Sequence, residues 1–136
     1  PNYFPIGVWL QDPANALAYR DIGVNLYVGL WQGPTEVQLE ALKSAGMRVI
    51  CPQNEVGRRH LDDYTIAAWM HGDEPDNAQR QDDGSWGPAV PPADLQANYE
   101  QWRSNDPTRP IWLNLGQGVA NDDWDGRAAP DEYYPA

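Results

Sequence analysis

Several features that would point to particular classes of protein are rare or missing in this sequence. Cys51 is the only cysteine, which excludes an internal disulfide and a thiolate-based zinc site. It lies in an apolar run that is typical of a core strand. No apolar run approaches the ~18 residues that a membrane-spanning helix needs. The chain begins with Pro1 rather than Met and shows no signal-like segment, as expected of a processed chain or a piece of a longer one. The sequence does not predict in which cellular compartment the protein works.

Positive charge is also scarce. Nine Lys and Arg face 20 Asp and Glu, and the net charge is −11. Because this excess repels other polyanions, nucleic acid and anionic membranes are poor candidates for partners. At 136 residues, the chain has room for one globular core and not for two domains.

Phenylalanine is nearly absent, whereas the other aromatic residues are abundant. The sequence has one Phe beside seven Trp and seven Tyr. Rings that carry a polar group suit surfaces that bind amphipathic ligands such as sugars, although Trp is also ordinary core material.

Short apolar runs alternate with helical patterns along the chain. Strands are predicted at residues 5–10, 25–30, 48–52, 66–70 and 111–116, and helices at 12–19, 35–46 and 94–102. Residues 56–64 form at most a short exposed helix, 78–92 are predicted to be a long loop, and 117–136 show no period. The alternation predicts an α/β fold with a parallel sheet, either doubly wound or a (β/α) barrel. No glycine-rich fingerprint follows the first strand, so dinucleotide binding is not expected.

The fourth predicted strand changes abruptly into Gly, Pro and three carboxylates. In α/β folds, the loop beyond a strand's C-terminal end is where ligand chemistry collects. Glu74 lies in this loop, directly before Pro75. Its neighbours Asp73 and Asp76 would disfavour its ionised form, as a general acid working near neutrality requires. The same residue types also favour a solvated turn, and this stretch alone does not decide between the two interpretations.

Polar and aromatic side chains follow all five predicted strands. Amides and carboxylates can bind sugar hydroxyls, and indoles can cover the apolar face of a sugar ring. Since the C-terminal ends of parallel strands meet at one edge, these residues predict a carbohydrate-like site. The candidate substrate-binding residues are Trp9, Trp31, Asn54, His71, Asp73, Asn114 and Gln117, with Glu74 as the catalytic candidate.

Three stretches carry a resemblance to a known clan of enzymes. They are residues 4–9 (FPIGVW), 72–76 (GDEPD) and 111–118 (IWLNLGQG). The chain resembles the first five βα units of a barrel glycoside hydrolase of the clan that places its acid/base Glu just after strand four. The resemblance implies a partial TIM-type (β/α) barrel over residues 1–136, with parallel strands in sequence order, helices on the outer face only, and Glu74 as the acid/base. The clan's usual motif is Asn-Glu-Pro, and Asp73 stands at the Asn position, which leaves open how the sugar 2-hydroxyl would be held.

A complete barrel of this type needs ~250 residues. The clan's nucleophile is a second Glu after strand seven, which has no counterpart here, and retaining hydrolysis requires both carboxylates. We therefore expect the N-terminal portion of a retaining glycosidase, incomplete at its C-terminus and inactive alone. Glu55, Asp122 and Asp123 are weaker candidates for a second carboxylate. The expected partners are an oligo- or polysaccharide and either the missing half of the barrel or further copies of the chain, with no cofactor and no metal.

Two other classes of function remain open. The first is a sugar-binding barrel without hydrolysis, which Asp73 in place of Asn mildly favours. The second is a divalent-cation site or a purely structural piece, with Asp73, Asp76, Asp122 and Asp123 as oxygen ligands. Their spacings match no calcium loop, so the cation site is the weaker alternative.

Overall fold

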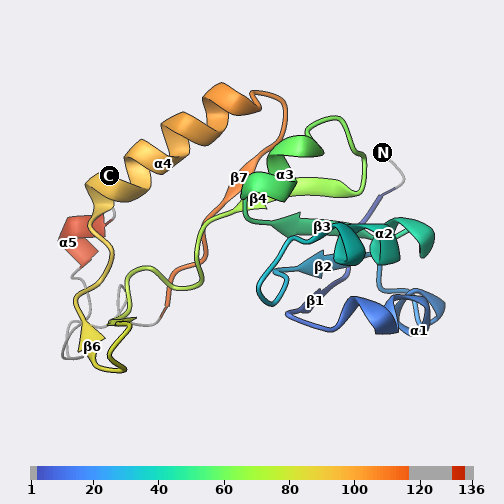
Figure 1. Cartoon of the computed structure of the whole chain (residues 1–136), viewed down its shortest axis with the longest axis horizontal. Coiled ribbons are helices and arrows are strands. Elements are labelled where there is room, and N and C mark those ends of the chain that lie inside the picture. Colours follow the sequence, from blue (N-terminus) through green and yellow to red (C-terminus); the bar gives the residue numbers. More distant parts are fainter. Residues whose placement is uncertain (1–2, 117–129, 134–136) are drawn as a thin grey trace. The chain divides into compact units, whose positions relative to one another are not determined.

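A computed structural model describes residues 3–116 and 130–133 of the chain (Figure 1). The residues group into two compact units. The first unit consists of residues 1–70 and 105–112, and the second of residues 71–104 and 113–136. Each unit is described separately below.

The first unit is built on a parallel sheet of five strands (Figure 1). The spatial order is β1-β2-β3-β4-β7, which is also the order of these strands in the sequence. All neighbouring strands run parallel, and each lies inside a segment predicted to be a strand. The α/β class and the strand order are therefore confirmed. The strands are β1 (Gly7–Trp9), β2 (Leu26–Val28), β3 (Arg48–Cys51), β4 (Ile66–Met70) and β7 (Ile111–Trp112).

Short helices connect the first strands of this sheet. They are η1 (Pro13–Asn15), α1 (Ala16–Asp21), α2 (Glu36–Ser44) and α3 (Glu55–Arg59). The capping box predicted at the start of α2 is present: Thr35 accepts a hydrogen bond from the backbone of Gln38, and the Gln38 side chain accepts one from the backbone of Thr35. These reciprocal bonds satisfy donors that have no partner inside the helix, which is why α2 begins there.

The strand order determines where these helices lie. Each strand is added beside the preceding one in the same direction, and right-handed crossovers then place the connecting helices on one face of the sheet. Contacts of α1 and α3 with aromatic rings of the sheet agree with this placement of the helices. The ring of Tyr27 in β2 meets the ring of Tyr19 in α1 edge to face, with centroids 6.0 Å apart. A Cβ on Gly57 of α3 would lie 3.0 Å from the Trp69 ring of β4. Among the described strands, the reversal of order that a doubly wound sheet requires does not occur.

The sheet carries apolar side chains on both faces. Tyr27, Val49, Cys51 and Trp69 are fully buried, and burial raises the pKa of the Cys51 thiol to about 12, against the opposing effect of Arg109. Cys51 is therefore a neutral core residue, as predicted. A second cluster contains Leu26, Val28 and Met70, with Ile50 and Trp112 packed against it. Beside this cluster lies an open apolar cavity of 420 Å³, whose lining includes Gly7, Trp9 and Val28.

The second unit combines a small hairpin with two helices. Its elements are β5 (Gln79–Arg80), β6 (Trp86–Gly87), α4 (Pro92–Asn105) and α5 (Pro130–Tyr133). Strands β5 and β6 pair antiparallel, so the prediction of a loop over 78–92 is wrong at these four residues. Each strand has only two residues, which is too short for an alternating pattern to be visible in the sequence. Gly84 permits the turn between them, because its φ of +83° is one that glycine adopts readily.

Two details of the second unit differ from the sequence pattern. Helix α4 begins at Pro92, so Asp94 lies in its first turn rather than at the predicted cap position. Helix α5 lies in the segment where no period was visible, and Tyr133 from this helix packs against Ala89, Leu95 and Leu115. None of the helices that the structure describes is long and apolar enough to cross a membrane.

Candidate functional site

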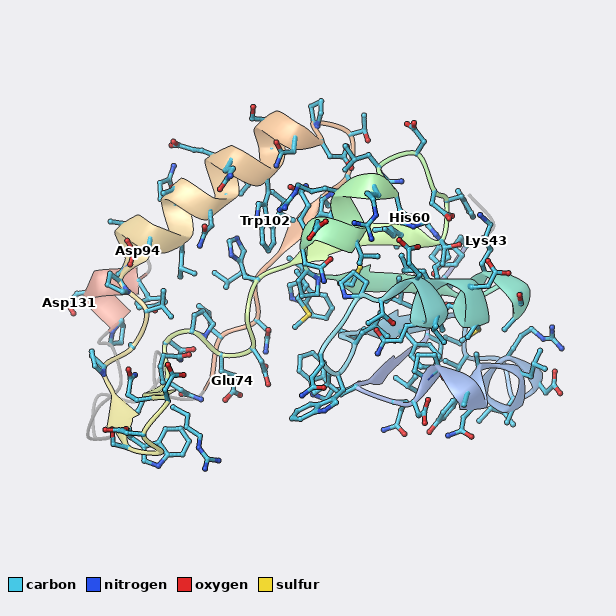
Figure 2. The ribbon with its side chains drawn as sticks, viewed as in Figure 1. Lys43, His60, Glu74, Asp94, Trp102 and Asp131 are labelled. Carbon is cyan, nitrogen blue, oxygen red and sulfur yellow. The ribbon has the colours of Figure 1, made fainter. Side chains whose placement is uncertain are left out.

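Glu74 lies in the turn that follows β4, four residues after Met70 in the sequence. Its backbone has a φ of +43°, in the left-handed region that residues other than glycine rarely adopt. Such a conformation persists only where the surrounding contacts hold it, and residues that have it cluster at functional sites. Leu10 and Gln32 also have a positive φ. Figure 2 shows Glu74 on this turn, and its side chain is half-buried.

Hydrogen bonds from three residues hold the Glu74 turn. The backbone N–H of Asn77 donates to the carbonyl of Glu74 at 3.0 Å. The side-chain amide of Gln79 donates to the carbonyls of Glu74 and Asn77 at 3.3 and 2.8 Å. The hydroxyl of Tyr133 donates to the carbonyl of Pro75 at 2.9 Å. The carbonyls of Glu74 and of the residues that follow it in the turn are thus fixed by hydrogen bonds.

The carboxylate of Glu74 has one close polar partner among the described residues. The side-chain Nδ2 of Asn77 donates a short hydrogen bond to Glu74 Oε2. Within the part of the chain that the structure describes, no hydrogen bond reaches the other carboxylate oxygen, Oε1. Of the two carboxylate oxygens, Oε2 is therefore the one with a donor among the described residues.

The segment after β7 contacts the Glu74 turn at two further carboxylates. Asn114 Nδ2 donates to Asp73 Oδ1 at 2.5 Å, and the backbone N–H of Gly116 donates to the buried Asp76 at 2.7 Å. The structure thus brings together Asp73 and Asn114, both predicted to bind substrate. The side-chain oxygen of Asn114 is buried and accepts no hydrogen bond from the described residues.

His71 is a packing residue of the second unit. Its ring stacks on Trp102 of α4, with centroids 4.7 Å apart and planes 15° apart, and Figure 2 shows Trp102 pointing away from the helix. Only 5% of His71 is exposed. Burial lowers the pKa of His71 below its ordinary 6.5, so the imidazole is neutral at pH 7. The predicted role of His71 in sugar binding is not tested by this geometry and stays a prediction.

Three of the predicted binding residues belong to the first unit. Trp9 is 39% exposed and lines the apolar cavity, so its ring is accessible for stacking. Trp31 is 72% exposed and borders a pocket of 310 Å³ with Gln11 and Gln38. Asn54 caps α3: its Oδ1 accepts from the backbone of Gly57 at 2.8 Å, and its Nδ2 donates to the carbonyl of Pro34 at 2.9 Å. The amide of Asn54 therefore has a structural explanation.

The remaining predicted residues are one binding candidate and the three candidates for a second carboxylate. Gln117, Asp122 and Asp123 lie outside the described residues. Glu55 is exposed at the start of α3 and forms an ion pair with Arg59 at 3.0 Å, as expected of a helix-surface residue. Within residues 3–116 and 130–133, no three His, Cys, Asp or Glu side chains lie close enough to hold a metal ion.

Five residues of this region were not among the predicted site residues: Asn77, Gln79, Trp102, Gly116 and Tyr133. Asn77 follows Asp76 directly and could have been found from its position three residues after Glu74, where a turn brings side chains together. The partners of Trp102, Gly116 and Tyr133 lie 31 to 58 residues away in the sequence, and no local pattern signals such contacts.

No family model, curated protein or solved structure matches the chain.

Proposed function

We propose that the chain is the N-terminal part of a (β/α)8 barrel of a retaining glycoside hydrolase, and that Glu74 is its general acid/base. The observation that carries the proposal is the turn after β4. There Glu74 has a left-handed backbone and its carboxylate is bonded at one oxygen by Asn77. The five parallel strands in sequence order support the same proposal, because a barrel is formed by adding βα units in this order.

The proposed reaction uses two carboxyl groups. Glu74 donates its proton to the glycosidic oxygen while a second carboxylate attacks the anomeric carbon and forms a glycosyl-enzyme intermediate. Glu74 then accepts a proton from the water that hydrolyses this intermediate. The two carboxyl groups of a retaining enzyme lie ~5 Å apart. We propose that the second carboxylate comes from a later strand of the full-length protein, and that the substrate is an oligo- or polysaccharide.

The test is Glu74→Gln in the full-length protein. Gln has the same shape but no transferable proton, so the rate should fall by ~10²–10⁴ on glycosides with poor leaving groups. Activated aryl glycosides need little protonation and should lose much less. The matched control is Glu40→Gln, an exposed position on α2, which should change neither rate. Equal losses of Glu74→Gln on both kinds of substrate would contradict general acid catalysis.

A sugar-binding protein without hydrolysis is the second candidate. Asp73, which replaces the clan's Asn and is bonded to Asn114, is the observation that favours it. Titration calorimetry of the full-length protein with oligosaccharides separates the two functions. Binding without turnover, unchanged by Glu74→Gln, would support the second candidate and reject the first.

A further inference from the structure

We propose that Asn77 is a positioning residue for the Glu74 carboxylate, and that Gly116 keeps the Asn77 amide in its working orientation. The inference rests on the proposed acid/base role of Glu74. It assigns a function to Asn77, which lies outside the three stretches that carry the resemblance, and to Gly116, which lies inside one of them but has no role implied by it.

The hydrogen bond from Asn77 suits a carboxyl group that gains and loses a proton. Asn77 Nδ2 donates to Glu74 Oε2. A carboxylate oxygen accepts such a bond, and so does the carbonyl oxygen of the protonated acid. If Oε2 is held in both states, the proton is carried by Oε1, the oxygen that no described residue bonds. Asn77 thus determines which oxygen of Glu74 faces the glycosidic bond.

Gly116 packs directly against the Asn77 amide. A Cβ at position 116 would lie 2.7 Å from Asn77 Oδ1 and 2.9 Å from Nδ2, closer than real Cβ atoms approach, and 3.0 Å from Cγ. The backbone of Gly116 is itself fixed by its hydrogen bond to Asp76 at 2.7 Å. A Cβ at this position would therefore displace the amide from where it reaches Glu74.

The orientation of the amide is also determined by charge. Asn77 Oδ1 is buried and accepts no hydrogen bond from the described residues, which costs free energy. Rotating the amide by half a turn would place Oδ1 against the carboxylate oxygen of Glu74, where two acceptors repel each other. The observed orientation leaves one acceptor unsatisfied and keeps the donor on the carboxylate.

The side chain of Asn77 is not what holds the backbone of the turn. The backbone N–H of Asn77 donates a hydrogen bond to the Glu74 carbonyl at 3.0 Å, and the Tyr133 hydroxyl donates one to the Pro75 carbonyl. The side-chain amide of Gln79 lies within hydrogen-bond distance of three carbonyls of the turn. All of these contacts remain in Asn77→Ala. Loss of the side chain should therefore free the carboxylate without unfolding the turn.

The experiment measures kcat and KM of the full-length protein for two glycosides, one with a poor and one with an activated aryl leaving group. Asn77→Ala should lower kcat on the poor leaving group by roughly 10-fold to 10²-fold, because a catalytic group that is misplaced by about 1 Å loses this much. The loss on the activated substrate should be several times smaller, and KM should change little. Gly116→Ala should give the same pattern, since it displaces the amide without removing it.

The control is Asn15→Ala, an exposed asparagine whose side chain makes no capping hydrogen bond, and it should leave both rates unchanged. Equal losses on the two substrates, or an unchanged kcat in Asn77→Ala, would overturn the positioning role even if Glu74→Gln shows the selective loss. If the wild-type protein cleaves no glycoside, the proposed function itself falls, and the inference with it. Should Gly116→Ala fail to fold, Asn77→Ala decides alone.

Discussion

The indole of Trp69 donates a hydrogen bond of 2.9 Å to the carboxylate of Asp106, and both residues are buried. Asp106 also accepts from Thr108 at 2.6 Å and from Arg109 at 2.7 Å. Burial alone would raise the pKa of Asp106, but these donors hold it well below its usual range. Because Trp69 belongs to β4 and Asp106 precedes β7, the hydrogen bonds of one carboxylate fix the last strand of the sheet beside its neighbour.

Trp69→Phe should therefore destabilise the first unit. Phe keeps most of the apolar ring but has no N–H, so a buried charged carboxylate loses one donor. The expected loss in the free energy of unfolding is about 1–3 kcal/mol. Urea denaturation measures it. Trp86→Phe is the matched control, because Trp86 is 70% exposed, and it should cost less than about 0.5 kcal/mol. A loss no larger than in the control would show that the hydrogen bond does not contribute to stability.

Asp63 should make stability depend on pH in the acid range. Burial raises the pKa of this carboxyl, but hydrogen bonds from Thr65 at 2.9 Å and from Lys43 at 3.0 Å outweigh burial and lower it from 3.8 to about 2. The folded state therefore favours the ionised form. The stabilisation is fully present above the unfolded pKa, and it is lost as the pH falls from 3.8 through about 2.

The measurement is the melting temperature of the wild-type protein and of Asp63→Asn between pH 5 and pH 2. Asn resembles the protonated acid, so the wild-type advantage should be largest at the upper end of this range and shrink toward the lower end. Asp62→Asn, which removes the same charge from an exposed neighbour, is the matched control. A wild-type advantage over Asp63→Asn that stays constant across the range would contradict the assignment.

The 136-residue chain on its own should associate with itself and show no glycosidase turnover. The apolar cavity of the first unit is open, and β1 and β7 each pair on one side only among the described strands. Unpaired edges and exposed apolar faces favour association, which the net charge of −11 opposes. Sedimentation velocity should show species larger than a monomer. Added salt should increase their share, because it screens the charge.

A monomer at all salt concentrations, with a sharp two-state melt and Glu74-dependent cleavage of an aryl glycoside, would contradict both parts of this prediction.

The fold could be predicted where the determining signals are local. Each sheet strand is an apolar run between turn residues, and α2 has its capping box in four consecutive residues, from Thr35 to Gln38. The β5–β6 hairpin was not predicted, because two-residue strands give no period. Part of the site could be predicted as well, because it depends on the same local pattern of strands. Asp73 and Asn114 lie at the ends of consecutive sheet strands, so the pattern of strands alone indicates that they meet.

The remaining site contacts depend on packing that the sequence does not display. The His71–Trp102 stack joins a strand end to a helix whose direction no local signal determines. The contact of Gly116 with Asn77 follows from the path of the backbone after β7. The amide of Asn54 was predicted to bind substrate because it follows a strand, yet the same position is a helix cap, and a polar residue at a strand end suits both roles.

The sequential order of the sheet has a consequence for the synthesis of the protein. Each strand pairs with the sheet strand synthesised just before it. When a new βα unit leaves the ribosome, the unpaired edge of the preceding strand is therefore already available for pairing. Sequence separations between partners are short for the first four strands, which favours rapid pairing. The edge at β4 is the exception, because its partner β7 starts only at residue 111. Among the strands that have two neighbours in the described sheet, β2, β3 and β4, it is therefore β4 that stays without its second neighbour for longest during translation.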